Sequence, residues 1–230
     1  MRKKCKVIAC SNTTALFYQN EIKIPVVDYV LNGVYNYNVK SITPFSSNKK
    51  HIGFIGCIDE LKGWRYLVEA YISLPLEIQE NVDLNFFGSV SEEDKLDFDN
   101  YLKTNTNIKY FGVVEEANYN VIPFLDFLVL PSRTEGLPMV ILEAMQSSVI
   151  CLVTNVGGVA EVIKNNYNGV IIKRDSECIR QQLIRLLTDV NLCEGLKIKA
   201  QETINIKFNS VNMANSYMIY YKKFCENNGN

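Results

Sequence analysis

Residues 127–146 read FLVLPSRTEGLPMVILEAMQ, and they indicate what kind of sheet this chain builds. Four consecutive apolar residues, Phe127–Leu130, are typical of a parallel strand that is buried on both faces. A polar loop containing Gly136 and Pro138 follows, and the apolar run after it predicts a helix over Met139–Gln146. We therefore expect a strand–loop–helix unit of an α/β sheet, whose ligands bind at the carboxyl ends of the strands.

The same alternation of short apolar strands and amphipathic helices extends along most of the chain. Strands are expected at residues 6–10, 26–31, 51–57, 83–87, 108–111, 127–130, 150–154 and 169–172. Helices are expected at residues 64–72, 91–103, 139–146, 159–164, 176–187, 191–204 and 211–226. The alternation predicts an α/β fold with a Rossmann-like doubly wound parallel sheet.

A turn-rich stretch divides the chain into two parts. Residues 43–50 read TPFSSNKK, which is typical of a linker. Residues 43–230 contain enough elements for one complete doubly wound domain. Residues 1–42 supply only two short strands and a helix, too little for an independent core. We therefore expect them to dock on the main domain or to belong to a structural unit that is missing from this sequence.

Composition excludes several classes of function. The chain has 230 residues, 47% of them hydrophobic, and a net charge of -1, whereas nucleic-acid-binding domains are usually strongly basic. No run approaches about 18 apolar residues, so no membrane span is expected, and no secretory signal is evident. Seven scattered cysteines without a Cys-x-x-Cys pair favour reduced thiols in the cytoplasm over disulfides or zinc. The only histidine, His51, is expected to have a structural role at a strand end.

Two carboxylates flank the start of the expected helix. Glu135 precedes Pro138, which suits a first helical position, and Glu143 lies inside the helix. Free N–H groups and the positive dipole end between them would suit a phosphate. A nucleotide-sugar, with its ribose, diphosphate and hexose, has this layout. The alternatives are a helix start capped by Thr134 or Glu135, and a buried Glu143 that pairs with Lys or Arg.

Two further loops also follow strands and open helices. Gly56 would let the backbone approach a ligand, and Lys62 precedes a helix start, where a cation is unfavourable by about 0.3–1 kcal/mol unless an anion binds there. The alternative is an exposed lysine in a turn. Gly157 and Gly158 in the other loop indicate a turn requirement more than a ligand contact. A glycosidase pair of acids is not indicated, because the separation of the carboxyl groups cannot be read from the sequence.

Six motifs occur in a specific order along the chain. They are Asn32-Gly33-Val34, the loop from Gly56 to Gly63, Phe111-Gly112-Val113-Val114, Pro131-Ser132, a Glu-x7-Glu pattern from Glu135 to Glu143, and Gly157-Gly158-Val159-Ala160-Glu161. Together they resemble the C-terminal, donor-binding half of a GT-B-fold retaining glycosyltransferase of group 1, the family of glycogen synthases and mannosyltransferases.

The resemblance implies roles for the residues that match. Glu135 and Lys62 would be catalytic, with Glu135 at the donor sugar and Lys62 neutralising the diphosphate leaving group. Glu143 would hold the ribose, and Val114 would meet the base through its backbone. The other donor-binding positions that it implies are Gly56, Gly136, Leu137, Pro138, Met139 and Val140. No cofactor and no metal are expected, because the nucleotide-sugar is a substrate and the chain has no Asp-x-Asp motif.

Two departures from the family pattern affect what the chain is expected to do. Cys57 stands where the family usually has Arg beside the diphosphate, which would cost about 1.5–3 kcal/mol unless Arg65 or Arg133 compensates. Residues 1–42 resemble only the last part of an N-terminal acceptor domain, whereas residues 43–230 resemble a donor domain with its C-terminal helix.

These features favour transfer of a sugar from a UDP- or GDP-linked donor to a saccharide or lipid-linked acceptor. Three alternatives remain open: a truncated, non-catalytic domain that binds a nucleotide-sugar or a partner; the donor half of a split enzyme with a separate acceptor-domain chain; and a nucleotide-sugar epimerase.

Overall fold

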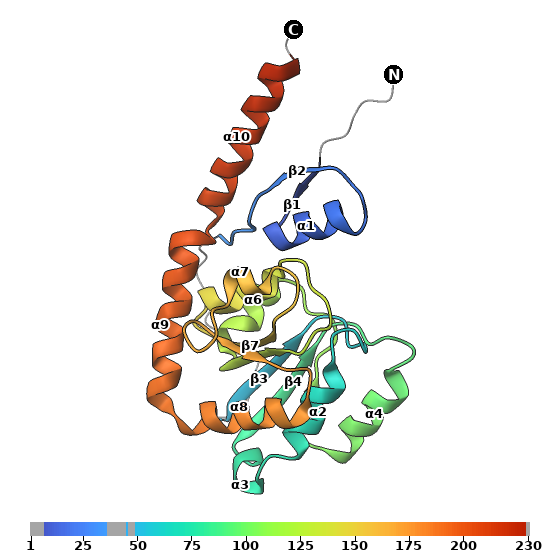
Figure 1. Ribbon diagram of the computed structural model, residues 1–230. Coiled ribbons are helices and arrows are strands. Elements are labelled where there is room, and N and C mark those ends of the chain that lie inside the picture. The colour runs from blue at the N-terminus through green and yellow to red at the C-terminus, as the bar shows by residue number, and fades with distance from the viewer. Residues whose placement is uncertain (1–6, 36–44, 46–48, 229–230) are drawn as a thin grey trace.

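The main body is a six-stranded sheet in which every strand pairs in parallel (Figure 1). The computed structural model describes residues 7–35, 45 and 49–228. The strand order is β5-β4-β3-β6-β7-β8. The strands are β3 (Lys50–Ile55), β4 (Val82–Phe87), β5 (Ile108–Tyr110), β6 (Phe127–Leu130), β7 (Ile150–Thr154) and β8 (Val170–Ile172). The predicted doubly wound α/β sheet is confirmed.

The strand order reverses at one point, between β3 and β6. From β3 the chain proceeds outward through β4 to β5, and then returns to β6 on the other side of β3. In sheets of this kind the crevice at such a switch point, outside the carboxyl ends of the strands, is where ligands bind. The loops that follow β3 and β6 are the two that carry Lys62 and Glu135, so the topology brings the predicted catalytic residues to this crevice.

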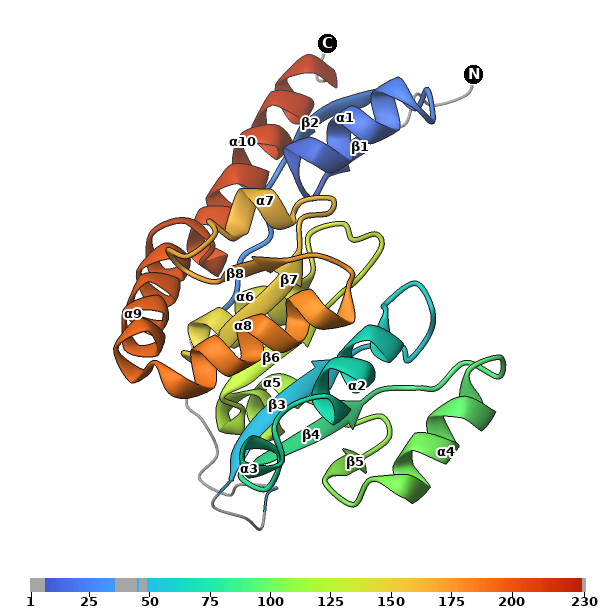
Figure 2. The same ribbon diagram turned by 60° about the horizontal axis from the view of Figure 1, so that its bottom comes forward.

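Helices cover both faces of the sheet. Helices α2 (Trp64–Ile72) and α8 (Ser176–Thr188) pack together in front of the sheet in Figure 2, and α6 (Met139–Gln146) packs against α9 (Val190–Lys207). The sheet strands are almost wholly buried; Ile52, Phe54 and Leu128, for example, are inaccessible to solvent. This two-sided burial explains why the strands read as continuous apolar runs.

Several short helices were not expected from the sequence. They are α3 (Leu76–Gln79), α5 (Ala117–Asn120) and the 3-10 helix η1 (Ile122–Phe124). Helix α7 (Val159–Val162) ends two residues before the expected bound, and α4 (Lys95–Thr104) begins four residues late. The late start has a local cause, because the Ser91 hydroxyl donates to Asp94 Oδ2 at 2.8 Å and closes a turn instead of a helix.

The N-terminal segment, residues 7–35, forms a small layer of its own. It comprises β1 (Val7–Ala9), α1 (Asn12–Asn20) and β2 (Val26–Tyr29), with β1 and β2 paired in parallel. In Figures 1 and 2 it lies beside α10 (Ser210–Asn228), above the main body.

The predicted docking of the first residues on the main domain is observed. Val34 N donates to Phe208 O at 2.8 Å, and Ser210 N donates to Val34 O at 2.9 Å. The expected linker, residues 43–50, lies outside the described residues except for Phe45, Lys49 and Lys50, and residues 1–6 and 36–42 also lie outside them. In the part of the chain that is described, no helix has the length and apolar character needed to cross a membrane.

Candidate functional site

The two predicted catalytic residues are in direct contact. Lys62 Nζ lies 2.7 Å from Glu135 Oε1, although 73 positions separate them in the sequence. The Ser132 hydroxyl donates to the same carboxylate oxygen at 2.7 Å. The Glu135 side chain is only 10% exposed and that of Lys62 29%. The alternative of a solvent-exposed lysine in a turn is therefore wrong.

The β3–α2 loop (residues 56–63) and the β6–α6 loop (residues 131–138) are locked together through their backbones. Arg133 N donates to Leu61 O at 2.7 Å. Gly63 has a φ of +73°, and a Cβ at this position would collide with the carbonyl oxygen of Pro131. Only glycine fits such a left-handed, crowded position without strain. These backbone contacts between the two loops hold Lys62 and Glu135 at a fixed position relative to each other.

Arg174, which sequence reasoning missed, ties the same two loops from the end of β8. Its Nε donates to Pro131 O at 3.1 Å, and its Nη2 donates to the Glu60 carbonyl and, at 3.0 Å, to Glu60 Oε1. A guanidinium suits this role because it presents several donors in a fixed geometry. The available signal was its position directly after a strand of a parallel sheet.

The β7–α7 loop (residues 155–158) supports Glu135 from the other side. Gly158 N donates to Gly136 O at 2.6 Å. Gly157 has a φ of +54°, and a Cβ there would collide with the carbonyl oxygen of Glu135. The paired glycines therefore meet a turn and packing requirement, as their sequence indicated, and the loop that they pack against is the one that carries Glu135.

Helix α6 begins without a side-chain cap. Pro138, with φ -70° and ψ 123°, is its N-cap residue and not the first helical position that its ring would suit, and the helix runs over Met139–Gln146 as predicted. Among the described residues no side chain caps the first turn, so the alternative of a cap by Thr134 or Glu135 is wrong. The start of α6 thus keeps its positive dipole end beside Gly136 and Met139, both of which are exposed.

Glu143 is a half-buried carboxylate on α6. Among the described residues it has no ion-pair partner and its side chain makes no hydrogen bond, so a structural pair with Lys or Arg is not observed in that part of the chain. Burial raises the pKa of Glu143 above its ordinary value of 4.5, because the charged form loses hydration. A carboxylate that is kept there without a partner is suited to accept hydrogen bonds from a ligand.

The remaining predicted positions lie on loops that follow β3 and β5. Gly56 has a φ of +147°, and apart from its chain neighbours no described residue has an atom within 4 Å of the position where a Cβ would stand. Gly88 N donates to Gly112 O at 2.8 Å, which joins the loop after β4 to the one that carries Val114. Val114 is half-buried. Open space above Gly56 is consistent with a close approach of a ligand to the backbone.

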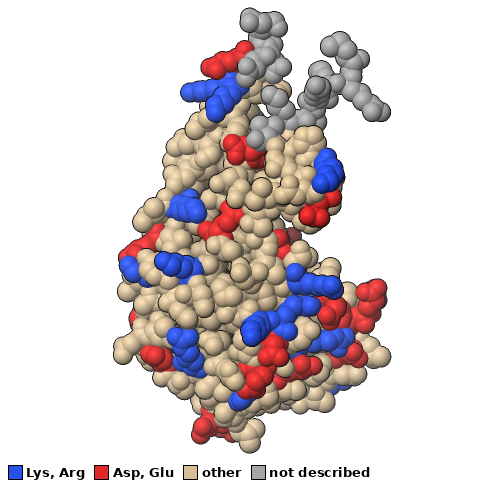
Figure 3. Space-filling model, in the orientation of Figure 1, with Lys and Arg blue, Asp and Glu red and all other residues tan. Residues whose placement is uncertain are grey.

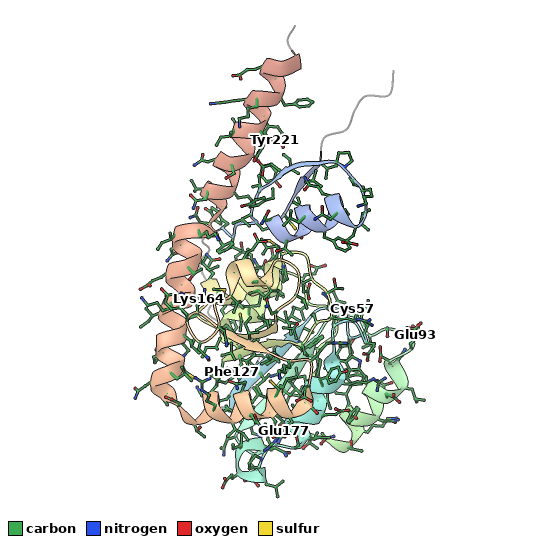
Figure 4. The ribbon with its side chains drawn as sticks, viewed as in Figure 1. Cys57, Glu93, Phe127, Lys164, Glu177 and Tyr221 are labelled. Carbon is green, nitrogen blue, oxygen red and sulfur yellow. The ribbon has the colours of Figure 1, made fainter. Side chains whose placement is uncertain are left out.

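Cys57 is a neutral thiol in this environment. It accepts a hydrogen bond from the Ser89 hydroxyl at 3.7 Å, and burial raises its pKa above the ordinary value. Arg65 does not compensate, because it is engaged by Asp94 at 2.8 Å and Asp97 at 2.7 Å. The Arg133 side chain is exposed and makes no ion pair within the described residues. Figure 4 labels Cys57 on the upper right of the main body, below the N-terminal segment.

The surface is hollowed beside this edge. Figure 3 shows a notch on the right side, between the N-terminal segment above and the main body below. Asn32 Nδ2 donates to Leu137 O at 3.1 Å, so the N-terminal segment also contacts the β6–α6 loop directly. No cluster of three or more His, Cys, Asp or Glu side chains suited to a metal ion occurs in residues 7–35, 45 and 49–228.

His51 is on β3, away from the carboxyl ends of the strands. It is buried and stacks on Phe45, with 4.0 Å between the ring centroids. This packing agrees with the structural role expected for it.

A family model and a curated relative both point to the same protein family. Residues 38–203 match the family model of glycosyl transferases group 1. An uncharacterized glycosyltransferase of Methanocaldococcus jannaschii is 26% identical over 96% of this chain and 60% of its own length.

Solved structures share the fold. A glycosyltransferase from Rickettsia africae superposes with a TM-score of 0.79 at 20% identity, over 96% of this chain and 64% of that one. The Anabaena protein HepE, crystallised with UDP-glucose, gives 0.79 at 17% identity over 96% of this chain and 65% of that one. The chain thus spans about two thirds or less of the length of these proteins.

Proposed function

This chain belongs to the glycosyl transferases of group 1, and we propose that it binds a UDP- or GDP-linked sugar and transfers the sugar with retention. The acceptor would be a saccharide or a lipid-linked saccharide. The observation that carries the proposal is the contact of Lys62 with Glu135, 2.7 Å apart, at the switch point of a parallel sheet and beside an uncapped helix start.

Each residue of the site has a distinct part in this proposal. The diphosphate lies at the start of α6, where N–H groups near Met139 and Val140 and the helix dipole favour an anion. Lys62 turns toward the leaving diphosphate and neutralises the charge that develops on it. Glu135, relieved of part of that contact, faces the anomeric carbon and stabilises positive charge there.

Glu143 and Val114 hold the nucleoside. A half-buried carboxylate without a partner among the described residues would accept hydrogen bonds from the ribose hydroxyls, each worth about 1.5–3 kcal/mol as a charge-assisted bond. Val114 meets the base through its backbone, and the backbone at Gly56 and Gly136–Pro138 completes the donor site. No metal is needed in this scheme, because Lys62 and the helix start supply the positive potential.

We further propose that residues 43–230 are the donor domain and that residues 1–42 belong to the acceptor side. The chain spans 60% of its archaeal relative, so a complete transfer site would need surfaces beyond those described here.

A second candidate is a donor half that works with a separate acceptor-domain chain. It is favoured by exposed apolar side chains on the N-terminal segment and α10, including Phe17 (53%), Ile22 (49%) and Tyr221 (60%). A two-stranded parallel sheet is also unusual on its own, since parallel sheets are generally covered on both faces. Co-purification of a second chain that restores transfer would favour this candidate.

Calorimetric titration with UDP, GDP and their sugars tests donor binding. We expect saturable binding of one nucleotide series, and absence of binding to every member of both series would refute the proposal. Product analysis separates transfer from the epimerase alternative, because a nucleotide-sugar epimerase would convert UDP-GlcNAc to an isomer without any acceptor.

A further inference from the structure

Glu161 reaches across from the main body to the N-terminal segment. Its Oε1 accepts hydrogen bonds from Thr13 N and the Thr13 hydroxyl, both at 2.8 Å, and its Oε2 accepts from Asn12 N at 3.2 Å. These contacts join residues that are 148 and 149 positions apart in the sequence.

The carboxylate completes the N-terminus of α1. Ser11, the N-cap residue, accepts from Thr14 N at 3.1 Å and leaves the N–H groups of Asn12 and Thr13 to be paired elsewhere. Glu161 pairs both of them and places a negative charge at the positive end of the helix dipole. Helix α1 therefore has a first turn that is satisfied partly by a side chain of the main body.

Glu161 is also connected to the loop that carries Glu135. It lies on α7, three residues after Gly158, whose N–H donates to Gly136 O at 2.6 Å. Gly157 allows no side chain, because its neighbour on this side is the carbonyl oxygen of Glu135. A displacement of α7 would thus be transmitted to Glu135, because Gly157 and Gly158 are closely packed against the backbone of Glu135 and Gly136.

The N-terminal segment meets the same loop at two more points. Asn32 Nδ2 donates to Leu137 O at 3.1 Å. Cys10, directly after β1, packs against the hydrophobic core of the main body, and its Sγ would lie 3.6 Å from a Cβ added to Gly136. The residues flanking α1 and the end of β1 therefore rest on the β6–α6 and β7–α7 loops together.

We infer that Glu161 is a positioning residue that couples the N-terminal segment to donor binding. The inference rests on the proposed function, because it concerns the geometry of the proposed donor site. Glu161 does not touch the donor; it holds α1 on the loops that present Glu135 and the start of α6. Since coupling between two sites is reciprocal, a bound donor that orders these loops must also strengthen the hold on α1.

Glu161→Gln tests the coupling with little change in shape. The glutamine keeps the side-chain length but removes the charge and turns an amide group toward one of the N–H donors. We expect donor affinity about five- to tenfold weaker than in the wild type, within the range of measured coupling energies. Glu202→Gln is the matched control, because Glu202 is an exposed helix carboxylate that pairs with Lys199.

Hydrogen exchange supplies a readout that a merely stabilising role would not move. In the wild type, a saturating nucleotide should slow amide exchange in Asn12–Asn20, and in Glu161→Gln this protection should disappear even when the nucleotide is saturating. Thr13→Val removes one of the three hydrogen bonds and should give an intermediate loss, whereas Thr13→Ser should restore the wild-type response. This pair also serves if Glu161→Gln folds poorly.

The outcomes separate the inference from the proposed function. A wild-type chain that binds no nucleotide refutes the proposed function, and the coupling with it. A wild-type chain that binds, together with a Glu161→Gln variant of equal affinity and equal protection of α1, overturns the coupling alone.

Discussion

Replacement of Lys62 by methionine separates the structural from the functional part of the Lys62–Glu135 contact. Methionine keeps most of the length and apolar stem of lysine but leaves Glu135, 10% exposed, with the Ser132 hydroxyl as its one side-chain partner within the described part of the chain. Breaking a buried pair in this way typically costs about 3–5 kcal/mol. Because Lys62 is 29% exposed, water screens part of the pair, and we expect about 2 kcal/mol.

The two effects have different magnitudes and different assays. For a chain of this size, 2 kcal/mol corresponds to a fall of about 4–8 °C in the midpoint of thermal unfolding. Loss of a charge-assisted contact with the diphosphate should weaken binding of the nucleotide-sugar by about 10–150-fold in calorimetric titrations. The matching nucleoside, which has no phosphate, should bind the variant and the wild type alike.

A matched control and a second variant make the test decisive. Lys50→Met removes an ion pair of similar length but greater exposure, with Asp126 at 2.8 Å, and should leave donor affinity unchanged. Adding Glu135→Gln to Lys62→Met should recover stability, because no unpaired charge remains, without recovering affinity. Unchanged affinity of Lys62→Met for the nucleotide-sugar, or an equal loss for the nucleoside, would refute the assignment of Lys62 to the diphosphate.

Three other substitutions test the rest of the site. Cys57→Arg should strengthen donor binding by about 10–100-fold through an added charge-assisted contact, measured by calorimetry, and unchanged affinity would remove the argument for a lost contact. Gly157→Ala should destabilise the fold by at least about 1 kcal/mol in denaturant unfolding, since φ is +54° and the carbonyl of Glu135 blocks a Cβ. Its control, Gly195→Ala, lies in an open position on α9 and should stabilise the fold by about 0.5–1 kcal/mol. Glu143→Gln should raise the midpoint of thermal unfolding at pH 7, because burial raises the pKa of Glu143 in the folded state and the ionised carboxylate therefore costs stability above that pKa. This gain in the midpoint should shrink as the pH falls toward 4.5, where the carboxylate becomes protonated. A gain that is constant with pH would contradict this cause. The same variant should bind the donor more weakly.

The strands and long helices were readable from the sequence because local patterns determine them. The bounds of β6, β7, α2 and α6 are those predicted, since each is an apolar run or an amphipathic period between clear turn residues. Short helices such as α3 and α5 contain too few residues to show a period.

The chemistry of the site was only partly readable. The sequence indicated Glu135, Glu143 and Lys62 as residue types suited to a nucleotide-sugar, but not that Lys62 lies against Glu135 in the absence of a ligand. It placed Arg174 just after a strand but did not show that its side chain joins the two loops, and it did not show that Glu161 reaches Thr13. These contacts span 43 to 148 positions and depend on the sheet order, which no local pattern encodes. For Gly157-Gly158 the sequence predicted a turn requirement, but it did not show that Gly157 packs against the backbone of Glu135.

A crystal structure of the chain with the nucleotide diphosphate that binds most tightly is the most direct test of the proposed donor site. The account predicts the diphosphate at the start of α6 within contact of Lys62 Nζ, with the ribose hydroxyls on the Glu143 carboxylate. A pocket of about 290 Å³ lies between residues 28–31, the end of α9 and α10, with Asp28, Lys207 and Tyr220 in its lining. Nucleotide bound in that pocket, or anywhere away from Lys62 and Glu143, would contradict the account.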